Sequence, residues 1–355
     1  MIGQRLYRAR KAAGLSLREL AEKVGLSHAA IKKYEDELAV PNSTTLIKLA
    51  QALQVRIEYF FRPETAALDD IEYRKCGSLP KKRLEAIEHE VIDHIERRME
   101  LEGLFPTPPL AEFAPVAGLP EKISDFAQIE DVAERVRNAW ALGYAPIREL
   151  IDVLETHGIR VFLIDANADA KFDGLAASVN GMPVIVVGSN WPGDRQRFTM
   201  AHELGHLMLA GRLADDVNEE QACNRFAGAF LVPRQSALQE LGRLRNFIEL
   251  KELALLKDEF GLSMSGVLYR ARDLGIVTST WRDQQARLFR SQGWHITEPG
   301  AAYPVEQPHV FEQLVFHALA EDYIGESKAA ELLGMQLGAF RKMRCLEGGH
   351  AAAHQ

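Results

Sequence analysis

Cysteine is scarce in this sequence, and the few cysteines lie far apart. Cys76, Cys223 and Cys345 are the only three, and no two of them form a CxxC pair. A disulfide framework needs an even set of cysteines, and a CxxC pair marks many zinc and redox motifs. The sequence excludes these classes of protein and indicates a reducing compartment.

Long apolar runs are also missing. No stretch approaches the roughly 18 consecutive apolar residues of a membrane-spanning helix. The N-terminal "MIGQRLYRARKAAG" is charged and lacks the apolar segment of a signal peptide. We therefore expect a cytoplasmic protein with no membrane partner.

Positive charge is unevenly distributed along the chain. The net charge is −8, yet residues 1–63 hold eleven Lys and Arg against six Asp and Glu, a surplus of five positive charges. The remaining residues must then carry a net charge of −13. A basic end on an acidic body favours a polyanion-binding module joined to a domain with another task.

The basic end has the capping pattern of consecutive short helices over residues 3–61. Ser16 can cap "LRELAEKVG", Ser27 can cap "HAAIKKYED" and Ser43 can cap "TTLIKLAQAL". The tight "VGLS" turn joins the second and third helices into a predicted helix-turn-helix. Apolar residues fall where the two helices would pack, which leaves His28, Lys32 and Lys33 on the outside.

A long charged helix is predicted over residues 79–104. Its apolar stripe has spacings of three and four and consists of Leu84, Ile87, Val91, Ile95 and Met99. This stripe predicts either a dimer seam or a face packed on the neighbouring domain. Five prolines in residues 104–120 then indicate a domain boundary.

The next region mixes helical and strand patterns. It predicts an α+β domain with a small sheet over residues 121–280, followed by a mostly helical region over 281–355. The expected strands are 159–165, 175–181 and 183–188, and the expected helices are about 128–142, 146–157, 195–210 and 216–230.

The helix-turn-helix sequence has an echo near the C-terminus. "AELLGMQLGAFRK" (330–342) aligns without a gap with "AEKVGLSHAAIKK" of the basic end and keeps two basic residues, Arg341 and Lys342. A fainter copy, "LKDEFGLSMSGVLYR", has Leu268 and Tyr269 in place of the two lysines. We interpret the fainter copy as a packing element, whereas the C-terminal copy retains the charge to contact DNA.

The stretch "FTMAHELGHLML" carries a candidate metal site. Residues four apart on an α-helix lie about 40° apart around the axis and roughly 6 Å along it. His202 and His206 can therefore bind one ion, with Glu203 beside them to accept a proton from an activated water. Gly205 allows close backbone approach, and burial of this charged triplet would be unfavourable without a metal or tight pairing.

A catalytic zinc requires a third protein ligand. The following "DVNEEQACNRFAGAFLVP" offers Glu220, three residues before Cys223 on the apolar face of a predicted helix. Glu219 is rotated from that face and expected in solvent. Cys223 is a rival ligand, although packing is its more ordinary role. Glu220 is the predicted third ligand.

Both motif sets resemble known families. "RFTMAHELGHLML" and "EEQACNRFAGAFLVP" resemble the ImmA/IrrE family of zincin-like metallopeptidases, and the likeness covers about residues 130–280. The segment 1–63 resembles the XRE/Cro/phage-repressor helix-turn-helix, including "VPNSTTLIKLAQALQV". The resemblance implies one Zn²⁺ per chain, or Mn²⁺, with Glu203 as catalytic acid/base and with His202, His206 and Glu220 as metal ligands.

One departure from the XRE pattern affects the DNA-binding prediction. These repressors commonly place Gln where Leu17 stands here, at the first turn of the second helix. We therefore expect His28, Ala29 and Lys32 to read bases. The other predicted DNA-binding residues, which would cap a helix or hold phosphates, are Arg18, Ser27, Lys33 and Ser43.

The sequence thus predicts an α+β protein of four parts. They are a helix-turn-helix domain (1–63), a helical and Pro-rich linker (64–120), a zincin-like domain (121–280) and a helical C-terminal region (281–355). One hypothesis is a homodimeric regulator that binds a double-stranded DNA operator and carries a zinc peptidase acting on repressor proteins in stress, phage or mobile-element control. The alternative is an antitoxin-like autorepressor whose zincin domain holds a toxin partner or a signal without turnover.

Overall fold

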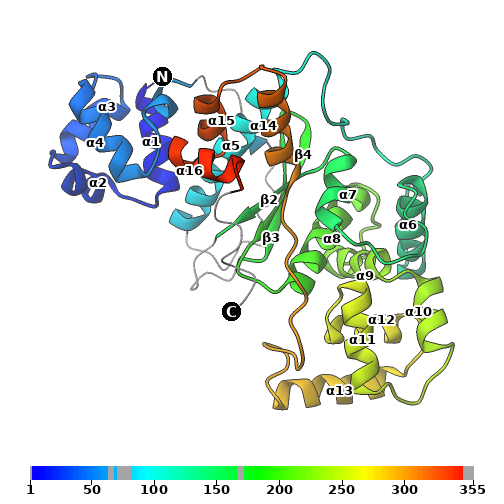
Figure 1. Cartoon of the computed structure of the whole chain (residues 1–355). Coiled ribbons are helices and arrows are strands. Elements are labelled where there is room, and N and C mark those ends of the chain that lie inside the picture. The colour runs from blue at the N-terminus through cyan, green and yellow to red at the C-terminus, as the bar shows by residue number, and fades with distance from the viewer. Residues whose placement is uncertain (1, 63–67, 70–80, 166–171, 347–355) are drawn as a thin grey trace. The chain divides into compact units, whose positions relative to one another are not determined.

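The computed structural model describes residues 2–62, 68–69, 81–165 and 172–346, and it divides the chain into two compact units (Figure 1). The first unit contains the described residues up to Asp69, those of 78–110 and those from His309 onward. The second contains Ala111–Pro308. The boundaries of these units differ from the predicted ones. The prediction treats residues 64–120 as a linker and residues 281–355 as one region, whereas each of these segments is divided between the two units.

The N-terminal part of the first unit is helical, as predicted. Ser16 caps its second helix in a capping box with Glu19, and Ser27 caps its third helix by accepting the Ala30 N–H at 3.1 Å. Its elements are α1 (Ile2–Ala12), α2 (Leu17–Val24), α3 (His28–Glu35), α4 (Ser43–Leu53) and the 3₁₀ helix η1 (Ile57–Phe61), and a short strand β1 (Leu68–Asp69) follows.

The prediction that Ser43 caps the fourth helix is wrong. Asn42 is the cap, and its side-chain oxygen accepts the Thr45 N–H at 2.9 Å. Ser43 is the first helical residue of α4. Asn and Ser are both strong N-cap residues, so an Asn one position earlier can begin the helix first.

The turn between α2 and α3 depends on glycine. Gly25 has φ of 70°, in the left-handed region that a side chain disfavours. Around this turn, the apolar residues of the helix pair are packed into one core with α1, α4 and η1, and Leu20 and Ile31 are fully buried. Arg10 and Glu35 add a buried bidentate ion pair, at 2.6 and 2.8 Å, between α1 and α3.

Helix α5 (Lys81–Glu102) decides between the two interpretations of the apolar stripe. Ile87, Val91 and Ile95 of the stripe are buried in the monomer, and α5 contacts α1. A dimer seam would need this stripe on the surface, so the structure favours packing within the chain. Residues 79 and 80 of the predicted helix lie outside the described residues.

The C-terminal helices belong to this first unit. They are α14 (Val310–Ala320), α15 (Glu326–Leu332) and α16 (Leu337–Arg344). Their apolar faces form one core with Leu101 of α5, and the largest side chain in it, Phe340, is fully buried. This grouping joins α5 to helices from the far end of the chain, although residues 111–308 of the second unit lie between them in the sequence.

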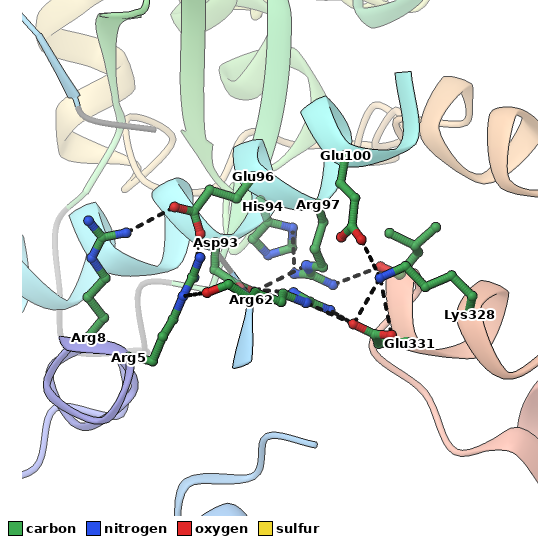
Figure 2. A network of polar contacts seen from close by, with 11 residues as sticks. Arg5, Arg8, Arg62, Asp93, His94, Glu96, Arg97, Glu100, Lys328 and Glu331 are labelled. Carbon is green, nitrogen blue, oxygen red and sulfur yellow. Dashed lines mark hydrogen bonds and ion pairs between the residues drawn. The ribbon is translucent and has the colours of Figure 1, made fainter. Parts of the chain in front are cut away.

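A network of charged side chains connects the N-terminal helices to α5 (Figure 2). Arg5 and Arg8 of α1 both bind the buried carboxylate of Glu96, and Arg8 does so at 3.0 Å. Arg62, which follows η1, pairs with Asp93 at 3.4 Å. Ion pairs shielded from water are screened less by salt than exposed pairs. These pairs therefore stabilise the packing of the N-terminal helices on α5.

The same network reaches α15. Arg62 pairs with Glu331 at 2.6 Å, and Lys328 pairs with both Glu331 and Glu100. Arg97 donates to the backbone carbonyl of Leu332 at 3.0 Å. Arg62 therefore binds α5 and α15 at once.

The second unit is an α+β assembly, which confirms the predicted fold class. Strand β4 (Met182–Gly188) pairs antiparallel with β3 (Gly174–Val179) on one side and parallel with β2 (Arg160–Ile164) on the other. The helices are α6 (Phe126–Ala139), α7 (Leu150–Thr156), α8 (Gly193–Leu209), α9 (Glu219–Leu231), α10 (Arg234–Leu241), α11 (Leu250–Phe260), α12 (Met264–Asp273) and α13 (Ser279–Ser291).

Residues 281–308 pack with this second unit. Glu298 accepts the backbone N–H groups of Met264 and Ser265 at 2.9 and 3.0 Å, at the start of α12. Carboxylates are stabilised at helix N-termini, where backbone N–H groups lack partners. The predicted C-terminal region is therefore shared between the two units. Within the described part of the chain, no helix is both long and apolar enough to cross a membrane.

The first unit generates a prediction about pH. Burial, with a smaller contribution from the Arg97 guanidinium, lowers the pKa of His94 from 6.5 to about 3. Below pH 6.5 the unfolded chain then binds a proton that the folded chain does not, so stability falls as the pH falls. His94→Gln should reduce the pH dependence of the unfolding free energy between pH 6.5 and 4, by at most about 1.4 kcal/mol per pH unit.

Urea unfolding at several pH values, followed by circular dichroism, measures this slope. His295→Gln changes an exposed histidine of the second unit and serves as the matched control. Equal slopes for wild type and His94→Gln would contradict the prediction.

Candidate metal centre and helix-turn-helix surface

Helix α8 presents the HExxH triplet to the interior of the second unit. His202, Glu203 and His206 are all buried. Arg197, one turn earlier, anchors the helix: it pairs with Glu306 and donates to the carbonyl of Ile147 at 2.7 Å. A buried guanidinium with several acceptors fixes the orientation of its helix.

The two imidazoles meet at one point. Nε2 of His202 lies 3.2 Å from Nε2 of His206. Two nitrogens that each stand 2.0–2.1 Å from a tetrahedral ion are about 3.3 Å apart. The observed separation fits two nitrogen ligands of a single metal ion.

Glu220 of α9 brings a carboxylate to the same point. Its two oxygens lie 3.7 Å from Nε2 of His202 and 3.7 Å from Nε2 of His206. The side chain is 48% exposed, so this side of the cluster opens to solvent. The structure thus brings together the three residues predicted as ligands, and it leaves an approach for water and a substrate, as a catalytic site needs.

The remaining ring nitrogens are held by two other residues of α9. Nδ1 of His202 lies 2.8 Å from Oδ1 of Asn224, and Nδ1 of His206 lies 3.2 Å from Oε1 of Glu219. An acceptor at Nδ1 places the proton there and leaves Nε2 as the metal-binding nitrogen. Glu219, predicted to lie in solvent, is 33% exposed, and its carboxylate also reaches His206.

Sequence reasoning did not assign a role to Asn224. The signal that could have found it is its spacing: Asn224 is one helical turn after Glu220, on the same face of α9. Glu219 precedes this face by one residue, and a helical wheel alone does not show how far its longer side chain reaches.

Cys223 also lies at the cluster. Its sulfur and the imidazole nitrogens of His202 and His206 are all within 4.8 Å of one another, and Cys223 is fully buried. The close approach depends on Gly205: a Cβ at that position would lie 3.2 Å from the Cα of Cys223. Glycine at this position therefore allows α8 and α9 to pack closely at the cluster.

The predicted DNA-binding residues lie on one part of the first unit. All seven are exposed, and they come from α2, α3, their turn and the first turn of α4 (Arg18, Ser27, His28, Ala29, Lys32, Lys33 and Ser43). Leu17 packs partly buried against the core of the N-terminal helices. Its packing role accounts for the departure from Gln at this position, since a side chain in the core is not available to read a base.

Within this surface, Lys32 has an intramolecular partner. Its ammonium group binds the carboxylate of Asp36 at 2.7 Å, and this hydrogen bond raises the pKa of Lys32. Exposed pairs one turn apart on a helix contribute only a few tenths of a kcal/mol. A DNA phosphate or base edge can therefore replace Asp36 with little loss.

Comparison with known proteins supports both parts. Residues 6–60 match the helix-turn-helix family, and residues 154–272 match the Peptidase_M78 family, described as the IrrE N-terminal-like domain. Uncharacterized HTH-type transcriptional regulators of Rickettsia prowazekii (strain Madrid E) and Rickettsia conorii (strain ATCC VR-613 / Malish 7) are 40% and 38% identical over 60 residues. Those residues are 17% of this chain, and they span 46% and 48% of the two relatives.

The match to the IrrE-like family covers α8 and α9 with the whole candidate metal cluster, and the helix-turn-helix match covers α2, α3 and their exposed basic residues. The chain therefore joins an XRE-type helix-turn-helix of transcription regulators to a peptidase domain of the IrrE/ImmA-like family.

Proposed function

We propose that this protein is a cytoplasmic, DNA-binding transcription regulator with a zinc-dependent peptidase centre that acts on repressor-type proteins. The observation that carries the proposal is the convergence of His202, His206 and Glu220 on one point, next to the buried carboxylate of Glu203. Stress, phage or mobile-element genes are the proposed targets, because the family resemblance associates such peptidases with repressor cleavage.

The donor set favours zinc as the ion. Two imidazole nitrogens and one carboxylate, with an open side, are the ligands of many catalytic zinc sites. Manganese is the alternative, although it is better suited to a set dominated by oxygen. When bound, the ion would supply Lewis-acid activation of a water molecule and of the substrate carbonyl.

The chain's own residues would then move the protons. Glu203 neighbours His202 on α8 and is not a proposed ligand, and its carboxylate would act as the general base. It would take the proton from the attacking water and give it to the leaving amine nitrogen. Asn224 and Glu219 would keep the two imidazoles oriented throughout, because both accept from Nδ1.

The substrate would be an extended peptide segment. Such a segment can add beside a strand of the sheet through backbone hydrogen bonds, and β2 stands at the edge of the order β3–β4–β2. An exposed segment near a helix-turn-helix of another repressor is the proposed target. We expect cleavage in trans, since a chain that readily cut itself would not persist at full length.

The alternative function is a sensor or antitoxin-like scaffold without turnover. Its supporting observation is Cys223, because a thiolate at this distance could complete a four-ligand site of the structural type. A toxin partner would then bind the acidic body of the chain. Incubating the purified protein with candidate repressors, with and without zinc, separates the two functions by the presence or absence of a discrete cut.

The first prediction from this proposal concerns metal content. Wild-type protein should contain about one zinc per chain, because the three donors form a single site. His206→Ala should lose stoichiometric zinc, and Asn224→Ala should weaken zinc binding about 10–100-fold, because the orienting acceptor is removed. Elemental analysis and competition with a chelator measure both effects.

His295→Ala removes an exposed histidine elsewhere in the second unit and should retain the metal. If His206→Ala contains as much zinc as wild type, the site assignment is wrong.

The second prediction concerns turnover. Glu203→Gln should retain zinc, because Glu203 is not a proposed ligand, and should lower cleavage of a repressor substrate by about 10²–10⁴-fold, because the proton acceptor is lost. Gel-based cleavage assays with matched zinc content provide the measurement. Full cleavage by the zinc-loaded variant would exclude Glu203 as the base, and Glu240→Gln, which changes an exposed carboxylate outside the cluster, is the control and should cleave like wild type.

The third prediction concerns DNA. We propose that α2 and α3 bind operator DNA, as a homodimer on a two-fold-related site. Lys32→Ala should weaken binding to the operator by about 1–3 kcal/mol if Lys32 reads a base. Binding titrations with operator and mixed-sequence duplexes measure the effect.

Lys251→Ala, at an exposed lysine of α11 in the second unit, is the control and should bind like wild type. Equal weakening by Lys32→Ala on both duplexes would make Lys32 a phosphate contact, and unchanged binding would remove it from the interface.

A further inference from the structure

The C-terminal helices α15 and α16 reproduce the geometry of the helix-turn-helix formed by α2 and α3. The two pairs align without a gap, so the N-caps Ser16 and Ser27 correspond to the N-caps Gly325 and Gln336. Both helices therefore begin at corresponding residues, the second helices also end at corresponding residues, and α15 ends one residue earlier than α2.

The turns of the two pairs are closed in the same way. Gly25 and Gly334 have φ of 70° and 68°. Gly334 donates its N–H to the carbonyl of Glu331 at 3.0 Å, and Met335 donates to the carbonyl of Ala330 at 2.9 Å. Gly25 and Leu26 make the two corresponding bonds at 3.3 and 2.9 Å. This is the Schellman arrangement that ends the first helix and redirects the chain.

The buried positions of the pairs correspond as well. Three aligned positions, two on the first helix and one on the second, are at most 4% exposed in both pairs, although the buried Leu332 of α15 aligns with the exposed Lys23 of α2. The three positions are Leu20, Ala21 and Ile31 in one pair and Ala329, Ala330 and Phe340 in the other. At these three positions the two pairs therefore bury corresponding side chains.

Docking of the C-terminal pair uses its first helix. Glu331 of α15 binds Arg62 (Figure 2). The carbonyl of Ser327 accepts from Arg56 at 3.2 Å. Lys328 of the same helix pairs with Glu100 of α5. A DNA-binding helix-turn-helix needs its second helix on the surface, and this docking leaves α16 with an exposed face.

That exposed face is basic. Arg341, Lys342 and Arg344 are exposed, and residues 333–346 contain no Asp or Glu. Arg341 and Lys342 align with the predicted DNA contacts on α3. Glu326, at the first turn of α15, binds the guanidinium groups of Arg341 and Arg344 at 2.8 and 2.7 Å and holds both on one side of α16.

A third pair, α11 and α12, has a similar turn between its helices but no basic residues at the two positions occupied by Lys32 and Lys33 on α3. Gly261 also has a left-handed φ, of 65°, between these helices. Its second helix has Leu268 and Tyr269 at the two positions in question, and Leu268 is buried. Tyr269 is in contact with the guanidinium groups of Arg272 and Arg282. Basic residues at these positions are thus a property of α3 and α16.

We propose that α15 and α16 form a second DNA-contacting helix-turn-helix, in which Arg341 and Lys342 bind backbone phosphates of the duplex that α3 of the same chain contacts. The inference rests on the DNA binding proposed above for α2 and α3. Both pairs belong to one compact unit, and the network of Figure 2 fastens α15 to the segment after α4. One chain would thereby cover more of the duplex than a single helix-turn-helix does.

The salt dependence of DNA binding tests this inference. The full-length protein is titrated by fluorescence anisotropy into a mixed-sequence duplex of about 40 base pairs, between about 50 and 200 mM salt. Loss of two phosphate contacts per chain in the double variant Arg341→Ala/Lys342→Ala should make the slope of log K against log salt less steep by about 1.8 for each bound chain. Lys251→Ala/Arg287→Ala removes two exposed cations of the second unit and should retain the wild-type slope.

Two further variants separate the possible failures. Arg341→Gln/Lys342→Gln keeps most of each side-chain stem and should give the same reduced slope if the charges bind phosphates. A wild-type slope in both α16 variants, or an equal reduction in the control, overturns the inference. If Lys32→Ala/Lys33→Ala reduces the slope while the α16 variants do not, only the inference fails. If wild-type protein binds no duplex, both the inference and the DNA binding proposed for α2 and α3 are wrong.

Discussion

The packing of α8 against α9 is the contact on which the candidate centre depends. Each histidine of α8 has one nitrogen directed at the shared point and the other held by a side chain of α9, Asn224 for His202 and Glu219 for His206. Glu220 comes from the same helix, so three residues of α9 act on two residues of α8. A shift of one helix would misplace all of them together.

Helices α8 and α9 pack closely because no side chain separates their backbones at Gly205. Gly205 has no side chain where the backbone of Cys223 approaches, and an added Cβ would lie 3.2 Å from the nearest backbone atom. Buried imidazoles and carboxylates are unfavourable without partners. The local packing therefore supplies a partner for Nδ1 of each ring and leaves both Nε2 atoms for the proposed metal ion.

In the first unit, ion pairs connect the helices. Glu96 and Glu331 each bind more than one cation, and Arg62 connects α5 to α15. Shared partners of this kind make the contribution of each pair depend on the others. The C-terminal helices are thus part of the unit that contains the predicted DNA-binding residues, and a substitution in either segment can change the stability of the other.

What the sequence by itself determined was local. The HExxH spacing placed His202 and His206 on one face of a helix, and Ser16, Ser27 and Gly25 marked the ends of the helices around the turn, because these features depend on neighbours within one or two turns. The echo at 330–342 was visible for the same reason. Even so, local rules left a choice between Asn42 and Ser43 as a cap, since both are good N-cap residues.

Only the tertiary structure decided which distant segments meet. The structure shows that the apolar stripe of α5 is buried within the monomer and that residues after 308 belong to the unit of the helix-turn-helix. It also shows that the carboxylate of Glu219 contacts His206. An apolar stripe or a carboxylate has the same pattern in the sequence whichever partner it finds. The partner is selected by the packing of whole elements, because each side chain must satisfy its neighbours in three dimensions at the same time.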